Sequence, residues 1–206
     1  MAYEIEIKAW IDDPPAIRAQ LRARATSIKD YVKEDVYFRS PVVAAADPAS
    51  GGDASDTATA RLGPPPSGAE TPQEFRLRRE GGTNVCTFKE KTIRRGVEVN
   101  REYEFTVSDG NAFEELVLRS GCRVFARKRK SGSVFALPEA NVEVSHVDGL
   151  GDFVEIEKLV EEHDSDAHNA AEETVRRVLD SLGVPESAIE ERPYTTLLAL
   201  QEQETL

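Results

Sequence analysis

The stretch EIEIK near the start of the chain carries residue types that could do chemistry. It places Glu4, Glu6 and Lys8 at alternate positions, with Ile5 and Ile7 between them. Side chains at alternate positions of a β-strand lie on the same face. The pattern therefore predicts a strand with one apolar face and one face that carries two carboxylates and an amine.

Four further segments repeat this alternation. They carry Arg76 and Arg78, Lys89 and Lys91, Glu102 and Glu104, and Glu155 and Glu157. For any one strand, an antiparallel sheet with a solvated face explains the pattern. Together, however, acids and bases fall on different strands, whereas a solvated face mixes both signs. A sheet that closes into a barrel with these faces inward would enclose acids on one side and bases on the other.

An interior of this kind would suit a polyphosphate and a metal ion. Carboxylates are hard oxygen ligands for Mg²⁺ or Mn²⁺, and arginine and lysine neutralise phosphate oxygens. A bound metal would offset the charge that develops during phosphoryl transfer, and it could activate a water or hydroxyl nucleophile.

The elements that must position these residues are mostly strands. Helices are predicted in DDPPAIRAQLRARA, in SDGNAFEELVLRSG, and at the C-terminus in DAHNAAEETVRRVLDSLG and RPYTTLLALQEQE. In the second helix we expect Phe113, Leu116 and Val117 to pack against the sheet. Strands are predicted in EIEIK, DYVKEDVYFRSP, EFRLRRE, NVCTFKEKT, EVNREYEFTV, CRVFARKRK, SVFALP, NVEVSHVD and DFVEIEKLV. The order indicates an α+β protein with about eight mostly antiparallel strands.

The chain of 206 residues is expected to form a single domain. Residues 41–73 are rich in small residues and proline, so we expect a flexible insertion there. Acids outnumber bases by 38 to 26, which argues against a nucleic-acid partner. Two cysteines without a ligand pattern, and no apolar run long enough to span a membrane, favour a cytoplasmic protein with no membrane partner.

At this point the motifs are recognisable. Glu4 to Lys8 matches the E-x-E-x-K signature of the CYTH superfamily, the triphosphate tunnel metalloenzymes. DVYF at 35–38, RLR at 76–78, FKEK at 88–91, RKRK at 127–130 and VDGLGDFVEIE at 147–157 follow in that family's order, and resemble its class IV adenylyl cyclase-like branch most. The resemblance implies an eight-stranded antiparallel β-barrel, open as a tunnel and flanked by helices, that binds a triphosphate with Mg²⁺ or Mn²⁺.

The resemblance also implies roles for individual residues. Metal ligands would be Glu4, Glu6, Glu155 and Glu157, and the catalytic group would be Glu4, Glu6 and Lys8. Substrate would be bound by Lys8, Arg76, Arg78, Lys89, Lys91, Lys128 and Lys130. In RKRK the inward pair could instead be Arg127 and Arg129, although Ala126 fits the small apolar place before Lys128.

The chain departs from the family pattern at two positions. Ser145 stands where the family usually has aspartate, and Glu143 shares its predicted face and could supply the carboxylate, whereas Asp148 should point away. Asn100 stands where the family tends to place arginine, and Arg101 should face outward.

Three functions remain open on the sequence. The first is hydrolysis of an inorganic or organic triphosphate, such as tripolyphosphate or thiamine triphosphate. The second is a class IV adenylyl cyclase reaction, in which ATP yields cyclic AMP and pyrophosphate. The third is a non-catalytic polyphosphate or nucleotide-binding protein, which the departures at Ser145 and Asn100 motivate. The motif order favours the cyclase-like branch, but hydrolysis demands less of a base and sugar pocket, so we favour the first function slightly. A homodimer is left open.

Overall fold

The computed structural model describes residues 3–41, 73–161 and 165–204. Its strands are β1 (Tyr3–Trp10), β2 (Thr26–Arg39), β3 (Glu74–Glu80), β4 (Thr83–Arg94), β5 (Val97–Val107), β6 (Arg123–Ala136), β7 (Asn141–Val147) and β8 (Gly151–Val160). Its helices are α1 (Pro14–Arg24), α2 (Gly110–Arg119), α3 (Ser165–Ser181), α4 (Tyr194–Glu204) and the short 3₁₀ helix η1 (Glu186–Ala188). The expected insertion at 41–73 lies, for residues 42–72, outside the described residues.

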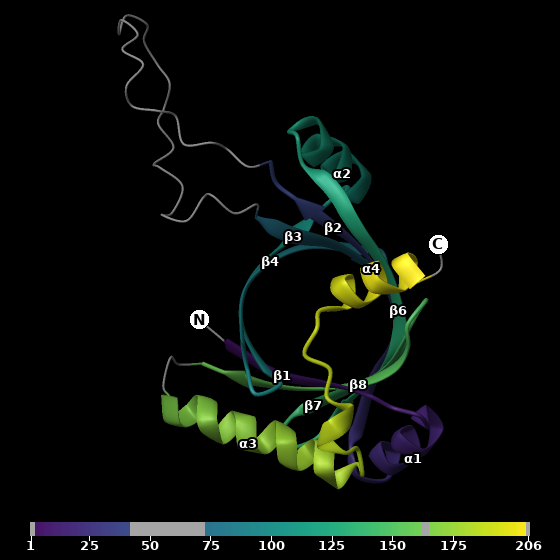
Figure 1. The fold of residues 1–206 in the computed structure, drawn as a ribbon, viewed down its shortest axis with the longest axis vertical. Helices are drawn as coiled ribbons and strands as arrows, with labels where there is room; N and C mark the ends of the chain where they lie inside the picture. The colour runs from purple at the N-terminus through teal and green to yellow at the C-terminus, as the bar shows by residue number, and fades with distance from the viewer. Residues whose placement is uncertain (1–2, 42–72, 162–164, 205–206) are drawn as a thin grey trace, which may run out of the picture.

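The eight strands form one closed antiparallel barrel in the order β1-β5-β4-β3-β2-β6-β7-β8. Figure 1 looks into the barrel, with α3 beneath it and α2 beside β2, β3 and β6. The expected α+β fold with an eight-stranded antiparallel barrel and flanking helices is therefore confirmed. None of the helices in the described ranges is long and apolar enough to cross a membrane.

The apolar core lies outside the barrel wall rather than inside it. Ile5 and Ile7 are fully buried, and they belong to the same cluster as Val175 and Leu179 of α3. Because successive side chains of β1 alternate, burying the isoleucines beneath α3 turns the charged residues between them into the barrel. At roughly 2 kcal/mol for each buried aliphatic side chain, this outer packing stabilises the inward direction of the charges.

Local sequence signals account for most boundaries. The Asp13 side chain accepts a hydrogen bond from the Ala16 amide and so caps α1, and Asp109 caps α2 in the same way. Between β3 and β4, Gly81 and Gly82 both have positive φ, a conformation that glycine adopts without strain. These turn residues account for the hairpin of β3 and β4.

Two expectations about elements were wrong. CRVFARKRK and SVFALP are halves of the single long strand β6, because Gly132 continues the pairing with Tyr31 on one side and Ser145 on the other. In α2, Phe113 and Val117 pack against the sheet cluster, but Leu116 is 61% exposed. The helix contacts the barrel along a narrow stripe, and Leu116 lies beyond its edge.

Candidate functional site

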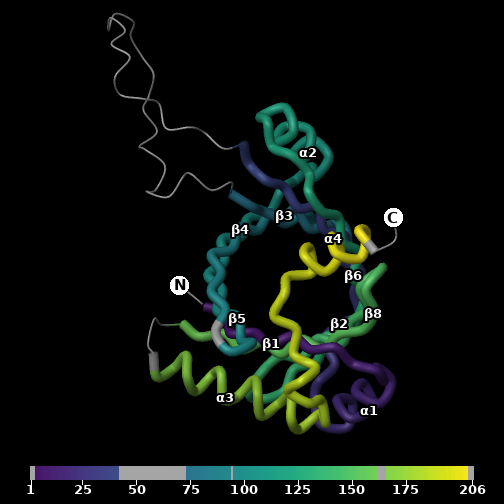
Figure 2. The backbone as a smooth tube through the Cα atoms, viewed as in Figure 1, coloured from purple at the N-terminus to yellow at the C-terminus, as the bar shows by residue number. Residues whose placement is uncertain are grey.

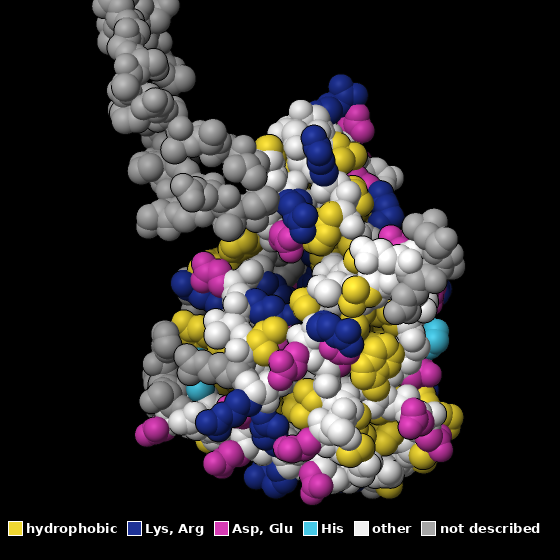
Figure 3. All heavy atoms as spheres, in the orientation of Figure 1, with side chains coloured by type: hydrophobic (Ala, Val, Ile, Leu, Met, Phe, Trp, Pro, Cys, Tyr) yellow, Lys and Arg dark blue, Asp and Glu magenta, His cyan; other side chains and the backbone are white. Residues whose placement is uncertain are grey.

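The barrel encloses a cavity of about 790 Å³. In the space-filling view its mouth is a hollow in which lysine or arginine side chains are visible (Figure 3). The cavity is lined by every site residue expected from the sequence: Glu4, Glu6, Lys8, Arg76, Arg78, Lys89, Lys91, Lys128, Lys130, Glu155 and Glu157. Lys128 and Lys130 face inward, whereas Arg127 and Arg129 pair outside with Glu114 and Asp148.

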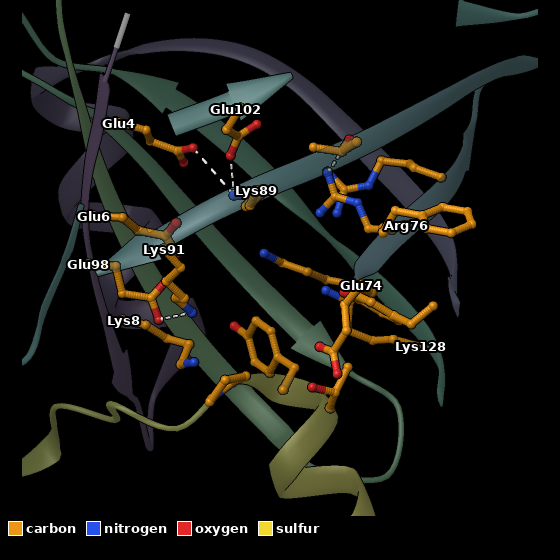
Figure 4. Close-up of a pocket in the computed structure, with 18 of the residues that line it drawn as sticks. Glu4, Glu6, Lys8, Glu74, Arg76, Lys89, Lys91, Glu98, Glu102 and Lys128 are labelled. Carbon is orange, nitrogen blue, oxygen red and sulfur yellow. Dashed lines mark hydrogen bonds and ion pairs between the residues drawn. The ribbon is translucent and has the colours of Figure 1, made fainter. Parts of the chain in front are cut away.

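Acids and bases occupy opposite arcs of the barrel. The lining acids come mainly from β5, β1, β8 and β7, which are consecutive neighbours, and the lining bases come mainly from β4, β3, β2 and β6. Lys8 on β1 and Glu74 on β3 are exceptions. In Figure 4, Glu4, Glu6, Glu98 and Glu102 lie on one side and Arg76 and Lys128 on the other. The predicted separation of charge is confirmed.

Three carboxylates form a row across the acidic arc. Glu6 is directly opposite Glu98 of β5 on one side and directly opposite Glu157 of β8 on the other. Burial raises the pKa of Glu157, and the neighbouring charge of Glu6 adds to this shift. Like charges directly opposite each other destabilise a sheet, so this row is a place where a cation would be stabilising.

The donor chemistry of this row fits a divalent metal. Carboxylate oxygens are the ligands that Mg²⁺ and Mn²⁺ prefer. Beside the row lies Asn100, which is fully buried and opposite Glu4 in the β-ladder, and its side-chain amide has no hydrogen-bond partner among the described residues. Within those residues, no three acidic, histidine or cysteine side chains already converge as a metal cage. Lysines hold several of the carboxylates instead.

Lys89 and Lys91 of β4 reach across to the acidic arc. Lys89 contacts Glu102 and donates a hydrogen bond to Glu4 at 3.4 Å, and Lys91 lies 2.6 Å from Glu98 (Figure 4). Burial raises the pKa of Glu4 to about 10, with further contributions from Glu102 and Glu6. Burial disfavours the charged form of Glu6 too, but Lys89 and other lysines outweigh it and lower the pKa of Glu6. The protein thus uses cations and one retained proton to balance its buried acids.

On the basic arc, Asp35 holds two of the bases in place. Arg78 contacts its two oxygens at 2.8 and 2.9 Å, and Lys128 lies 3.1 Å from it. Although burial opposes ionisation, the hydrogen bond from Arg78 and the charge of Lys128 hold the pKa of Asp35 well below its usual range. This forked pair fixes the direction of the guanidinium.

A second buried cluster joins β2, β6, β7 and β8. Lys130 contacts Glu155 and lies 3.3 Å from Glu143, which also accepts a hydrogen bond of 2.7 Å from Lys33. Burial lowers the pKa of Lys130 to about 7, and the nearby Lys128 and Lys33 contribute. Glu143 therefore lines the cavity as its alternation with Ser145 suggested, while Ser145 itself is fully buried.

The chain that leads into α4 crosses in front of the barrel opening (Figures 1 and 2). Lys8 donates a hydrogen bond of 2.6 Å to the backbone oxygen of Arg192. The ring of Tyr194 lies 4.4 Å from the amine of Lys8 and 4.6 Å from that of Lys128, so it contacts bases from both arcs. It also packs edge-on against Phe153 at 4.9 Å.

Sequence reasoning missed several residues of the cavity. Glu98 has the same alternation as Glu102 and Glu104, so parity along β5 could have found it. Lys33 is two residues before Asp35 on β2, so parity could likewise have placed it on the same face of the strand. Tyr194 also lines the cavity, and no local sequence pattern indicates that α4 returns to the tunnel.

The CYTH domain family matches residues 2–194, from the first glutamate pair through Tyr194. The chain belongs to this family. The match includes all eight strands of the barrel.

Individual proteins are similar to this chain over nearly its whole length. A Methanocaldococcus jannaschii protein that is provisionally named an adenylate cyclase is 24% identical over 198 residues, covering 96% of this chain and 99% of the relative. A conserved hypothetical protein from Pyrococcus furiosus has a TM-score of 0.71 and 26% identity, with 94% of this chain and 99% of that one covered. A Hippeastrum protein described as an adenylyl cyclase with a dominant triphosphatase activity has a TM-score of 0.60 at 13% identity, with coverage of 97% and 95%. At that identity the likeness concerns the fold.

Proposed function

We propose that this protein hydrolyses a triphosphate within the barrel in a reaction that depends on Mg²⁺ or Mn²⁺. The observation that carries the proposal is the row Glu98, Glu6 and Glu157, which faces an arc of lysine and arginine side chains across one cavity. A negatively charged chain of phosphates would lie along the bases, and the carboxylates would hold a divalent cation that offsets part of its charge.

The basic side chains would bind the phosphates, and the acidic side chains would bind the metal. Arg76, Arg78, Lys89 and Lys128 would bind phosphate oxygens from the basic arc, and Lys8 from the acidic arc. Glu4, Glu6 and Glu157, with Glu155, would hold the metal, which would supply charge neutralisation. In hydrolysis the oxygen of a water would attack the terminal phosphorus and the bond to the bridging oxygen would break, which gives diphosphate and orthophosphate and passes the proton of the water to solvent.

Cyclisation is the alternative reaction, and the provisional name of the Methanocaldococcus jannaschii relative supports it. In that case the ribose 3′-hydroxyl of ATP attacks the α-phosphorus, and pyrophosphate leaves. The Hippeastrum protein, whose dominant activity is described as triphosphatase, supports hydrolysis. Hydrolysis also demands less of the site, because a water needs no sugar pocket.

The test is a product assay on the purified protein. Tripolyphosphate, thiamine triphosphate and ATP are incubated separately with Mg²⁺ or Mn²⁺. Release of orthophosphate supports hydrolysis, cyclic AMP supports cyclisation, and binding without a product supports a non-catalytic protein.

The double variant Glu4→Gln with Glu6→Gln tests the assigned residues. It should abolish metal-dependent turnover and leave the fold intact, because both side chains lie in the cavity rather than in the apolar core. The matched control is Glu34→Gln with Glu90→Gln, since both of these side chains are more than half exposed. Undiminished activity of the Glu4 and Glu6 variant would contradict the assignment.

A further inference from the structure

Two aromatic rings face the cavity beside the basic arc. Tyr37 of β2 and Phe125 of β6 both line it, and their ring centroids are 6.1 Å apart. Neither residue belongs to the apolar clusters formed by the described residues. The rings are therefore not accounted for by packing of the core.

An irregularity in the barrel turns Phe125 inward. Tyr37 pairs with Ala126, whereas the next residue, Phe38, pairs with Val124, so Phe125 is an extra residue in β6. Regular alternation would place Phe125 on the outer face with Arg127. A β-bulge redirects side chains, and bulges of this kind are frequent beside active sites.

A cation lies over the Phe125 ring. The guanidinium of Arg39 lies 4.5 Å from the ring centroid. Glu74 fixes that guanidinium through two contacts, of 3.0 Å to Nε and 2.6 Å to Nη2. The ring and the charge together form a platform that could attract a flat group with delocalised electrons.

The platform adjoins the bases that are proposed to bind phosphate. The amine of Lys128 lies 5.7 Å from the centroid of the Tyr37 ring, and Tyr37 Oη lies 3.4 Å from Asp35, the partner of Lys128. A group attached to one end of a triphosphate held by Lys128 would thus be within reach of the two rings.

Resting on the proposed function, we infer that Tyr37, Arg39 and Phe125 bind a planar heteroaromatic group, so that the substrate is an organic triphosphate ester. Inorganic tripolyphosphate has no apolar surface and would gain nothing from these rings. Aromatic side chains stack on any base because every base has a π-face. A nucleobase and the rings of thiamine share this chemistry, and both are included in the test.

The test compares Phe125→Ala with the unaltered protein on ATP, thiamine triphosphate and tripolyphosphate. We expect kcat/KM for at least one ring-bearing ester to fall about tenfold, mainly through KM, and kcat/KM for tripolyphosphate to stay within about twofold. Phe125→Tyr should restore the loss, because it retains the ring. Phe105→Ala is the control, since this phenylalanine is 55% exposed on the outer face. The ester whose kcat/KM falls more in Phe125→Ala identifies the kind of ring that the platform binds.

An equal loss on tripolyphosphate, or no loss on either ester, would overturn the inference. If the unaltered protein cleaves tripolyphosphate but neither ester, the inference fails while the proposed hydrolysis stands. If none of the three is cleaved, the proposed function fails, and affinity for a non-hydrolysable ATP analogue against imidotriphosphate still tests the platform. In that measurement Phe125→Ala must lower the affinity for the ATP analogue and leave the affinity for imidotriphosphate unchanged.

Discussion

Lys89 of β4 donates a hydrogen bond of 3.4 Å to Glu4 of β1, although β5 lies between their strands. The contact spans the boundary between the basic and acidic arcs. The amines of Lys89 and Lys91 on β4 are thus both paired with carboxylates. A ligand must replace these internal partners, and several predictions about binding depend on that exchange.

Metal and triphosphate should bind cooperatively. A cation that takes Glu4 would free Lys89 from this carboxylate for phosphate, and a phosphate bound to Lys89 would free Glu4 for the cation. We therefore expect saturating Mg²⁺ to raise the affinity for imidotriphosphate at least about tenfold, with the reciprocal effect on Mg²⁺ of equal size. Isothermal calorimetry measures the affinity for imidotriphosphate and the affinity for Mg²⁺, each with and without the other ligand. Affinities that are independent of the second ligand would contradict this exchange.

Binding of the metal should release a proton from Glu4. Burial raises the pKa of Glu4 to about 10, so its carboxyl keeps a proton at neutral pH, and a cation binds only the ionised form. Apparent metal affinity should rise with pH by up to about tenfold per unit below that pKa. Calorimetry in two buffers of different ionisation enthalpy counts the protons. Glu4→Gln should abolish the release, and an unaltered protein that releases none would disprove it.

Asp35→Asn should destabilise the fold. The change leaves Arg78 and Lys128 buried without their partner, which costs about 3 kcal/mol in the free energy of unfolding. Because the folded pKa of Asp35 lies below its unfolded value of roughly 4, the contribution is complete above that pH and declines as pH falls below it. Urea unfolding at pH 7 and pH 3 should show a smaller difference at pH 3.

The control for that measurement is Asp148→Asn. This side chain is half exposed and its pair with Arg129 lies on the surface, so we expect a change of at most about 0.5 kcal/mol. A loss for Asp148→Asn as large as that for Asp35→Asn would mean that burial of the pair is not the cause.

Tyr194→Leu should loosen the segment that crosses the barrel opening. The change removes the edge-on contact with Phe153 and the ring beside Lys8 and Lys128, and we expect a loss of about 2 kcal/mol in stability. Tyr194→Phe keeps the ring and should lose less than about 1 kcal/mol. Thermal unfolding of the two variants separates them. Equal losses would assign the effect to the hydroxyl instead of the ring.

The sequence alone predicted much of this protein. Alternation in EIEIK and FVEIE determined which side chains share a face, and the motif order indicated the family and its barrel. The choice of Lys128 and Lys130 over their arginine neighbours rested on Ala126, which fits the small apolar place before them in the family pattern. The face of a side chain and the local motifs depend only on residues that are neighbours along the chain, so the sequence displays them directly.

Tertiary structure decided which strands became neighbours. Placing β5 between β1 and β4 brought Glu98 opposite Glu6, and closing β8 against β1 added Glu157 to the same row. The bulge at Phe125 and the return of Tyr194 from α4 likewise depend on pairing and packing between distant segments. Periodicity determines the face of a residue, but only barrel closure determines what that face meets.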